Sequence, residues 1–383
     1  MVNKIVLNET SYFGDGARSV IVEEVNKRGF KKALVVSDKN LVEANVTSKV
    51  TEILEKNGLE YEIFSDIKPN PTVLEVKKGI EKCKEVGADY LIAVGGGSSI
   101  DTAKAIGIVM TNPEYSDIVS LEGIVNTKNK SLPLIALPTT AGTAAEVTIN
   151  YVITDEENVK KMVCVDPNDI PIIAIIDTEL MSSMPSSIAA STGMDALTHA
   201  IEGYITKSAW SMSDMFHMQA IKMIFDNLEK AVNEKNKEAI YNMGVAQYIA
   251  GMGFSNVGLG IVHSMAHSLG AYYDTPHGVA NALLLPHVMK YNGTVAVNRY
   301  REIGVNLGFE MNNLSDEEVI DKVVKSVRDL AIKVNIPQTL REIGAKEEDF
   351  KALAEKAIVD VCTGGNPRNT SVEEIIQIYK EAF

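Results

Sequence analysis

The first half of the chain alternates between two patterns of apolar residues. Short apolar runs rich in β-branched residues predict buried strands, and longer stretches with apolar residues at helical spacing predict amphipathic helices. The strand-like runs lie at 32–38, 61–65, 89–94 and 132–137, with further ones at 4–7, 147–154, 162–165 and 171–176. Helical stretches lie at 20–29, 47–54 and 72–86, and a further one follows the run at 89–94 and reaches Val109. This alternation predicts an α/β fold, a Rossmann-like parallel sheet with helices on both faces.

The pattern changes after Asp177. Pro185 precedes a region without strand-like runs, in which apolar residues recur at helical spacing. The clearest of these helical stretches lie at 211–232, 316–334 and 372–383. We place a domain boundary near 180–186, which gives an α/β domain over 1–183 and an all-helical domain over 184–383. The length of 383 residues agrees with two domains.

Every histidine of the chain lies in one stretch of the second half. The six are His199, His217, His263, His267, His277 and His287. Asp195 and His199 are four residues apart, as are His263 and His267, so each pair shares one face if its segment is helical. His277 follows ten residues after His267, just before another apolar run. This is the spacing of a divalent metal site.

The ligand set that this spacing predicts has one carboxylate, Asp195, and three imidazoles, those of His199, His263 and His277. Such a set suits Zn²⁺ or Fe²⁺ better than Mg²⁺ or Ca²⁺, which prefer shells made entirely of oxygen. It contains no cysteine, which favours a site open to a substrate oxygen over a closed structural zinc site. Any one of these histidines alone would be better explained as a hydrogen-bonded core residue, and their number in one stretch favours the metal.

The remaining histidines have other predicted roles. His267 shares a face with His263, and we interpret it as a group that hydrogen-bonds or relays a proton near the bound oxygen. His217 lies on an amphipathic stretch and is expected to pack there. His287 follows Leu285-Pro286 and is expected to cap or pack.

A glycine turn in the first half is a candidate phosphate site. Gly95-Gly-Gly-Ser98 stands between a predicted strand and a predicted helix, where glycines let a phosphate approach the backbone N–H groups of a helix start. The turn is neither G-x-G-x-x-G nor a Walker A loop, so a plain tight turn is an equally good interpretation.

Hydroxyl and carboxylate residues follow two other predicted strands. Thr139, Thr140 and Thr143 come after the strand at 132–137, where their hydroxyls would reach a ligand at the carboxyl edge of the sheet or serve as ordinary caps. Asp38 ends the first long strand, where a carboxylate would bind a ribose diol and repel a 2′-phosphate. That favours NAD over NADP, although a turn aspartate explains the residue nearly as well.

Composition excludes several classes of partner. The net charge of −14 argues against nucleic acid and anionic membrane surfaces. The cysteines Cys83, Cys164 and Cys362 form no C-x-x-C pair, and their odd number argues against a disulfide framework. No run of 18 apolar residues and no apolar leader is visible, so we expect a cytoplasmic protein with no membrane span.

Four motifs resemble those of the iron-containing (group III) alcohol dehydrogenases, and the resemblance covers essentially the whole chain. They are Gly95-Gly-Gly-Ser-x-x-Asp101-x-x-Lys104, Pro138-Thr-Thr-Ala-Gly-Thr-Ala-Ala-Glu-Val147, Gly193-Met-Asp-Ala-Leu-Thr-His-Ala-Ile-Glu202 and His263-x-x-x-His267-x9-His277-Gly278. Two segments depart from the pattern expected in the nearest enzymes, because Ser99-Ile100 stands for Pro-Gln and Ser268 stands for a proline after His267.

The resemblance implies the dehydroquinate synthase-like fold of that family, a homodimer, and a small aldehyde or alcohol as substrate. It implies Fe²⁺ held by Asp195, His199, His263 and His277, with Zn²⁺ able to replace it during purification. It implies NAD(H) in a cleft between the domains. The implied NAD(H) contacts are Asp38, Asn70, Gly96, Gly97, Ser98, Thr139, Thr140, Thr143, Asn150 and Lys161. Two other interpretations remain open, a zinc-dependent glycerol dehydrogenase or dehydroquinate synthase, and a binding scaffold without catalysis.

Overall fold

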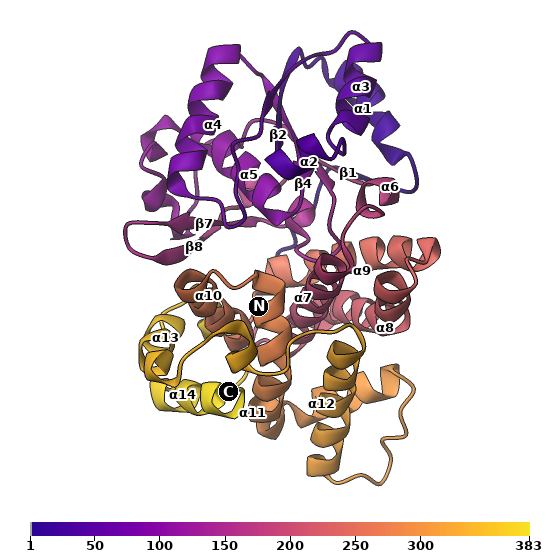
Figure 1. The fold of residues 1–383 in the computed structure, drawn as a ribbon, viewed down its shortest axis with the longest axis vertical. Helices are drawn as coiled ribbons and strands as arrows, with labels where there is room; N and C mark the ends of the chain where they lie inside the picture. Colours follow the sequence, from indigo (N-terminus) through magenta and orange to yellow (C-terminus); the bar gives the residue numbers. More distant parts are fainter. Residues whose placement is uncertain (1) are drawn as a thin grey trace. The chain divides into compact units, whose positions relative to one another are not determined.

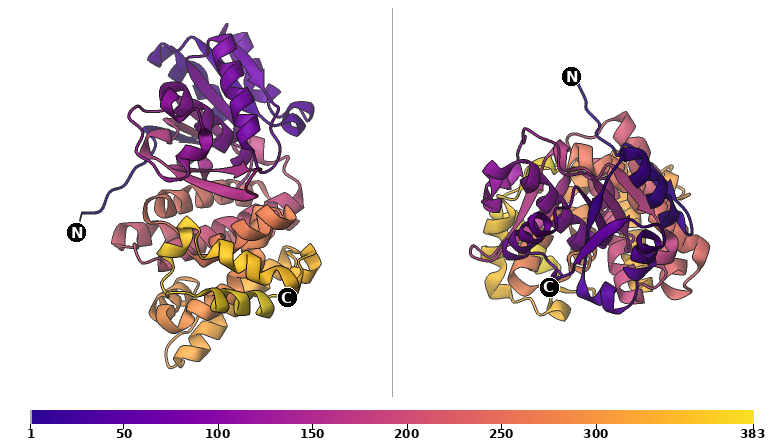
Figure 2. Two further views of the ribbon diagram at one scale, coloured as in Figure 1. Left: turned by 90° about the vertical axis from the view of Figure 1, so that its left-hand side faces the viewer. Right: turned by 90° about the horizontal axis from the view of Figure 1, so that it is seen from above.

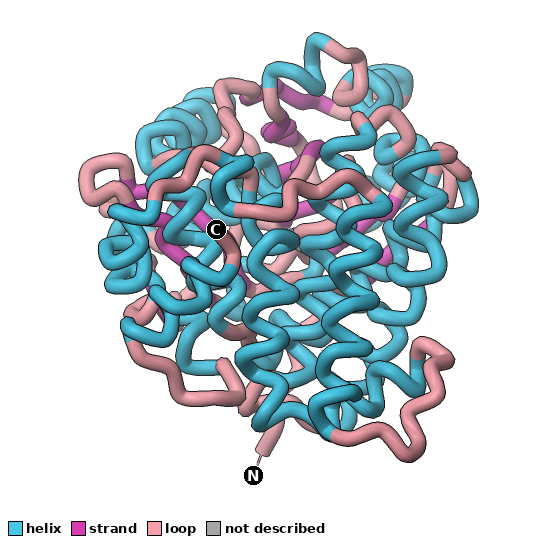
Figure 3. Tube along the Cα trace, turned by 60° about the horizontal axis from the view of Figure 1, so that its bottom comes forward, coloured by secondary structure: helices cyan, strands magenta, loops and turns pink. Residues whose placement is uncertain are grey.

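The chain, described here by a computed structural model over residues 2–383, forms two compact units. The first ends at Met184 and the second runs Pro185–Phe383 (Figure 1). All strands of the described chain lie in the first unit, whereas the second consists of helices and loops (Figure 3). The predicted fold class, an α/β domain followed by a helical domain, is therefore confirmed.

The first unit is built on a parallel sheet with the strand order β1-β9-β6-β4-β2-β3. Its strands are β1 (Thr10–Phe13), β2 (Lys32–Ser37), β3 (Glu60–Phe64), β4 (Tyr90–Gly95), β6 (Leu134–Pro138) and β9 (Ile173–Ile176). The strand predicted at 4–7 is wrong, because the chain before β1 is irregular and leaves the sheet (Figure 2). The edge strand instead begins at Thr10, which pairs with Ile173 of β9.

A second, three-stranded sheet departs from the predicted arrangement. It consists of β5 (Gly123–Ile124), β8 (Lys160–Val165) and β7 (Asn150–Asp155). β7 and β8 form an antiparallel hairpin, in which alternate residues of β7 are buried, so only one of its faces is covered. The run at 162–165 lies within β8, as predicted, whereas the run at 147–154 is a strand only from Asn150, because Val147 ends a 3-10 helix. Their pairing with each other outside the main sheet is not visible in the local pattern.

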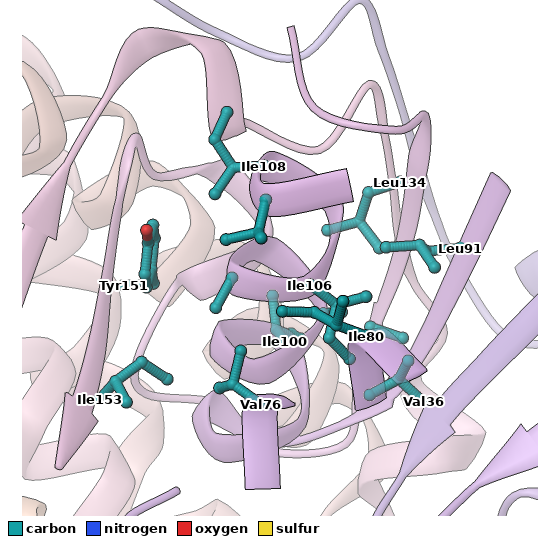
Figure 4. Close-up of a cluster of buried hydrophobic side chains, with 14 of the residues drawn as sticks. Val36, Val76, Ile80, Leu91, Ile100, Ile106, Ile108, Leu134, Tyr151 and Ile153 are labelled. Atoms are coloured by element: carbon teal, nitrogen blue, oxygen red, sulfur yellow. The ribbon is translucent and has the colours of Figure 1, made fainter. Parts of the chain in front are cut away.

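Helices cover both faces of the main sheet, as the alternation of patterns predicted. Along β2, Leu34 and Val36 belong to one apolar cluster and Ala33 and Val35 to another, because successive strand side chains point to opposite faces. The first cluster includes residues of α4 (Val73–Val86) and α5 (Gly97–Thr111), several of which Figure 4 labels. The second includes residues of α1 (Ile21–Arg28) and α3 (Ser48–Lys56).

The ends of α4 follow from its sequence. Thr72 and Glu75 form a reciprocal capping box at its start, and Gly87 closes it in the left-handed conformation with φ of 67°. In its middle, a Cβ on Gly79 would lie only 2.3 Å from Cδ1 of Ile106. The missing side chain therefore lets α4 and α5 pack closely over the sheet.

The strand order places a topological switch point between β2 and β4. The chain leaves β2 for β3 on one side and returns through α4 to β4 on the other side of β2. In open α/β sheets ligands bind outside the carboxyl ends of the strands at such a point. Asp38 follows β2 there, and Gly96 follows β4.

The second unit is a set of packed helices. They are α7 (Ser186–Ile205), α8 (Ser211–Asn233), α9 (Lys237–Val257), α10 (Ile261–Tyr273), α11 (His277–Asn306), α12 (Asp316–Lys333), α13 (Phe350–Ala357) and α14 (Val372–Glu381). α7 is buried along nearly its whole length from Ala189 to Ile205, and α10 is buried from Ile261 to Gly270. These two helices are buried on all sides although both carry polar residues, which form the cluster described below.

No single helix among residues 2–383 is long and apolar enough to cross a membrane. The helices Lys237–Val257 and Ile261–Tyr273 reach that length and apolar composition only together, with a bend of 101° between them.

His217 and His287, which were given no part in the predicted metal site, lie on helices of the second unit. His217 is completely buried between α7 and α9, where a Cβ on Gly203 or Gly253 would lie 2.3 Å from its Nε2. Burial lowers the pKa of His217 to about 3, so its ring is neutral. His287 lies inside α11, so the part of the prediction that made it a helix cap is wrong.

The contact between α4 and α5 yields a stability prediction. Ile106→Ala removes a fully buried side chain that packs on Gly79, and we expect it to lower the free energy of unfolding by about 2–5 kcal/mol. Urea unfolding followed by circular dichroism measures the change. Leu74→Ala, at a position 56% exposed on α4, is the control and should change that free energy by no more than about 0.5 kcal/mol. Equal effects of the two variants would contradict the packing described here.

Candidate metal centre and cofactor-binding site

Four predicted ligand groups lie together inside the helical unit. Asp195 and His199 are on α7, His263 is on the first turn of α10, and His277 is the first residue of α11. One donor atom from each lies within 4.8 Å of the others. Asp195, His199 and His263 are buried, and the side chain of His277 is 29% exposed. The four residues that the sequence singled out are thus brought to one place.

A carboxylate on α7 fixes how α10 meets it. Oε1 of Glu202 accepts the backbone N–H of Val262 at 2.7 Å, so the carboxylate lies at the N-terminus of α10, where the helix dipole favours an anion. A Cβ on Gly260 would lie 2.8 Å from the same oxygen. The glycine before α10 therefore leaves the space that Glu202 needs.

The donor distances suit a shared ion. Oδ1 of Asp195 lies 3.9 Å from Nε2 of His263 and 3.6 Å from Nε2 of His277. Donors about 2.0–2.2 Å from one tetrahedral ion lie on the order of 3.5 Å apart. The rings of His199 and His263 are stacked with centroids 4.6 Å apart. One carboxylate with three imidazoles is a donor set for Fe²⁺ or Zn²⁺, so these residues fit the predicted metal.

Glu202 also determines which nitrogen of His263 faces the cluster. Its Oε2 lies 2.6 Å from Nδ1 of His263, and its two oxygens already accept the backbone N–H groups of Val262 and His263, so Nδ1–H donates and Nε2 offers its lone pair. Burial lowers the pKa of His263 to about 3, so the ring is neutral, as a ligand must be. Burial raises the pKa of Glu202 to about 7, while the backbone N–H groups that it accepts oppose that rise.

His267 is held by a different carboxylate. Its Nδ1 lies 2.9 Å from Oδ2 of Asp360, and the other oxygen of Asp360 accepts the N–H of Cys362 at 2.9 Å. Burial alone would raise the pKa of Asp360, but the contacts with His267 and Cys362 outweigh it and bring it to about 2. Asp360 is therefore an acceptor, so Nδ1 of His267 carries the proton. The ring stacks on that of His277 at 5.4 Å.

An asparagine touches three of the four ligand groups. Asn281, one turn after His277 on α11, is fully buried. Its Nδ2 lies 2.6 Å from Oδ1 of Asp195, 3.2 Å from Nε2 of His263 and 3.1 Å from Nε2 of His277.

Sequence reasoning assigned no role to Glu202, Asn281 or Asp360. Two of them carried a usable signal, since Glu202 follows His199 by three residues and Asn281 follows His277 by four, both spacings that share a helix face. Asp360 carried none, because it lies 93 positions from His267.

In the first unit, the glycine turn lies against two of the predicted threonines. Gly96 and Gly97 begin α5, where no side chain caps the free N–H groups. A Cβ on Gly96 would lie 3.2 Å from Cγ2 of Thr140, and one on Gly97 would lie 3.0 Å from Cγ2 of Thr143. The glycines thus let both threonines approach the start of α5, which is an arrangement suited to a phosphate.

Two more of the implied cofactor residues contact each other. Nζ of Lys161 donates to Oδ1 of Asn70 at 2.7 Å. Asn70 has φ of 59°, a left-handed conformation that asparagine tolerates better than most residues. Asn150 begins β7, and its backbone oxygen accepts Nζ of the buried Lys104 at 2.9 Å. Lys104 therefore joins α5 to the start of β7.

The other implied residues lie at the carboxyl edge of the sheet. Asp38 caps α2 (Lys39–Glu43), its Oδ1 accepting the N–H of Leu41 at 3.0 Å. The alternative interpretation of Asp38 as a turn aspartate is therefore correct for one of its carboxylate oxygens, Oδ1, which caps α2. Ser98 is on the first turn of α5, and the N–H of Thr139 donates to the carbonyl of Gly95 at 2.9 Å.

Comparison with known families identifies the group to which the chain belongs. Residues 8–178 match the iron-containing alcohol dehydrogenase family, and residues 189–383 match the C-terminal part of the same family. The chain is an iron-containing alcohol dehydrogenase family member. The resemblance seen in the motifs is confirmed, and with it the assignment as an oxidoreductase.

Individual relatives match over their whole length. Lactaldehyde reductase of Escherichia coli K12 is 52% identical over 383 residues, covering 100% of both chains. A crystal structure of 1,3-propanediol oxidoreductase matches with a TM-score of 0.96 at 40% identity, again covering 100% of both chains. Sulfoacetaldehyde reductase from Bifidobacterium kashiwanohense in complex with NAD⁺ matches with a TM-score of 0.88 at 29% identity, covering 100% of this chain and 99% of that one.

The glycine turn yields a prediction about cofactor binding. Gly97→Ala places a Cβ 3.0 Å from Cγ2 of Thr143, so the threonine must move, and we expect KM for NADH to rise by roughly tenfold, equivalent to ~1.4 kcal/mol. Thr143→Ser in the same chain removes that methyl and keeps the hydroxyl. The double variant should recover most of the affinity, and a double variant no better than Gly97→Ala would contradict the close approach.

Glu202 yields a prediction about the metal. In Glu202→Gln the side chain keeps its size, but an amide must now face both Nδ1–H of His263 and the N–H of Val262 with only one acceptor. We expect metal affinity to fall about 10- to 100-fold. Competition with a chromophoric chelator measures it. The control is Glu302→Gln. Glu302 lies near the other end of α11, where its carboxylate accepts a hydrogen bond from Tyr204, so this variant should keep wild-type metal affinity.

Proposed function

We propose that this protein catalyses the reversible reduction of lactaldehyde to 1,2-propanediol, with NADH as the hydride donor and Fe²⁺ as the metal. The observation that carries the proposal is the match to E. coli lactaldehyde reductase, 52% identical with both chains fully covered. The 1,3-propanediol and sulfoacetaldehyde enzymes share only 40% and 29% of their residues with this chain.

The metal would be held by Asp195, His199, His263 and His277. Bound there, a divalent cation acts as a Lewis acid toward a carbonyl oxygen and lowers the cost of the negative charge that develops on it. The protein's own part is to hold the donors still. Phe254 stacks on the His199 ring with centroids 4.1 Å apart and planes within 8°, and it covers that ring with an apolar surface.

His267 is the group proposed to exchange the proton that reduction of an aldehyde consumes. Its Nδ1–H is committed to Asp360 at 2.9 Å, so Nε2 is the ring atom left for proton exchange. Asp360 keeps this tautomer because its carboxylate accepts and does not donate. The hydrogen bond also fixes the plane of the ring beside His277.

NAD(H) is proposed as the cofactor of the first unit, where it supplies or accepts a hydride. The support is the glycine turn at the start of α5, the threonines against it, and a structural relative solved with NAD⁺. Asp38 lies after β2 at the switch point, where a carboxylate binds a ribose diol and repels a 2′-phosphate. We therefore propose a preference for NADH over NADPH.

Two further expectations from the family resemblance complete the proposal. The protein is proposed to form a homodimer and to act in the cytoplasm, without nucleic acid or membrane partners. Its three cysteines are free thiols, as a reducing compartment would keep them. Light scattering on the purified protein measures the oligomeric state, and a monomer would contradict the dimer.

A second candidate is an iron-dependent dehydrogenase of another short alcohol, such as 1,3-propanediol, butanol or ethanol. The observation in its favour is the TM-score of 0.96 with 1,3-propanediol oxidoreductase. A zinc enzyme resembling glycerol dehydrogenase is also compatible with the donor set. Metal analysis after anaerobic purification distinguishes iron from zinc.

The proposal predicts a substrate order. With Fe²⁺-loaded protein and NADH, kcat/KM for lactaldehyde should exceed that for propanal, which lacks the hydroxyl, and for 3-hydroxypropanal, which carries it elsewhere, by at least about tenfold. Steady-state NADH oxidation across these aldehydes measures the order. If 3-hydroxypropanal is preferred, the second candidate replaces the first. His263→Ala should remove both bound metal and turnover, and an active metal-free variant would contradict the metal's role.

A further inference from the structure

The contacts of Asn281 compete with a metal for the same electron pairs. Its amide nitrogen lies within 3.2 Å of Nε2 of His263 and within 3.1 Å of Nε2 of His277. Each neutral imidazole has one ring lone pair, at the nitrogen without the proton. In His263 that nitrogen is Nε2, because Nδ1 donates to Glu202. A lone pair that binds a cation cannot also accept a hydrogen bond.

The orientation of the amide follows from its neighbours. Asn281 would place its oxygen against the Asp195 carboxylate if the amide were turned, and two oxygens 2.6 Å apart with no proton between them would repel. The nitrogen therefore faces Asp195. The amide oxygen, Oδ1, is buried and has no hydrogen-bond partner among the described residues. The amide oxygen of Asn281 is thus unpaired, while its N–H groups point toward the ligand cluster.

We propose that Asn281 is a positioning residue that acts as an internal substitute for the cation. Its amide holds the carboxylate of Asp195 and the imidazoles of His263 and His277 together, and metal binding must displace its contacts with the two imidazoles. The inference rests on the metal centre of the proposed function.

The sign of its effect on affinity follows from linkage. A carboxylate oxygen has more than one lone pair, so Oδ1 of Asp195 can accept from Asn281 and bind an ion at the same time. This hydrogen bond is therefore present with and without metal, and its contribution to the free energy of metal binding largely cancels. The amide nitrogen carries two N–H groups, so while one donates to Asp195 the other is shared between the two imidazoles. That shared contact exists only without the ion. Interactions lost on binding oppose binding, so Asn281 weakens metal affinity and stabilises the metal-free protein.

The decisive variant is Asn281→Leu, which keeps the branched shape and removes the amide. We expect Zn²⁺ and, under anaerobic conditions, Fe²⁺ to bind about fivefold more tightly, within roughly 2- to 12-fold for the one N–H group that the two imidazoles share. Chelator competition measures the affinity. Scanning calorimetry after chelation should show a lower Tm for the metal-free variant, with a larger rise when metal is added.

Asn292→Leu is the matched control. Asn292 is on the same helix and equally buried, but its amide pairs with Asn366 and not with the ligand groups. It should lower stability with and without metal alike and leave metal affinity unchanged. Tighter binding in both leucine variants would overturn the inference, since the effect would then not belong to the Asn281 contacts.

The remaining outcomes are distinguishable. Weaker binding by Asn281→Leu would overturn the inference and make the amide a support of the loaded centre. If that variant does not fold, Asn281→Ala takes its place, and weaker or unchanged binding there overturns the inference too. If the wild type binds no metal, or if His263→Ala binds as well as the wild type, the metal centre of the proposed function fails instead.

Discussion

The helical unit depends on keeping a carboxylate and several imidazoles together in an apolar interior. Asp195 and Glu202 are 1% and 2% exposed, and a buried carboxylate without hydrogen bonds or a counter-charge costs several kcal/mol. Glu202 meets this cost with N–H groups from the start of α10 and with the His263 ring. Asp195 meets it with Asn281. The packing of α7, α10 and α11 is therefore set by polar groups as much as by apolar ones.

The same constraint organises the α/β unit around Lys104. Its ammonium group is completely buried and donates to the backbone oxygens of Thr148 and Asn150 at 2.6 and 2.9 Å. Burial lowers the pKa of Lys104, and burial raises that of Asp169, 4.0 Å away, well above its usual range. Through these contacts, Lys104 and Asp169 fix the positions of α5, β7 and the segment before β9 relative to one another. Satisfying a buried cation thus also positions Asn150 at the carboxyl edge of the sheet.

The sequence predicted the elements whose signal is local and missed those defined by long-range pairing. β2 and β4 are continuous apolar runs because both of their faces are buried, and they were predicted within one or two residues. Residues 4–7 have the same local pattern but no strand beside them. In the site, Asp195 and His199 are recognisable from their spacing on α7. Asp360 is not, because only the tertiary fold brings it to His267.

Ser99-Ile100 and Ser268, the departures from the pattern expected from the resemblance, lie on α5 and α10, two helices that carry site residues. Ile100 is fully buried in the apolar cluster between α5 and the sheet, and Ser99 packs against Gly95. Ser268 is the more informative departure. A proline in the middle of α10 would remove a helical hydrogen bond and bend the helix directly after His267. With serine, whose hydroxyl donates to the carbonyl of Ser264 at 3.3 Å, α10 continues unbroken to Tyr273. A regular helix keeps His263 and His267 one turn apart on the same face, so each ring reaches its own carboxylate, Glu202 or Asp360, without backbone strain.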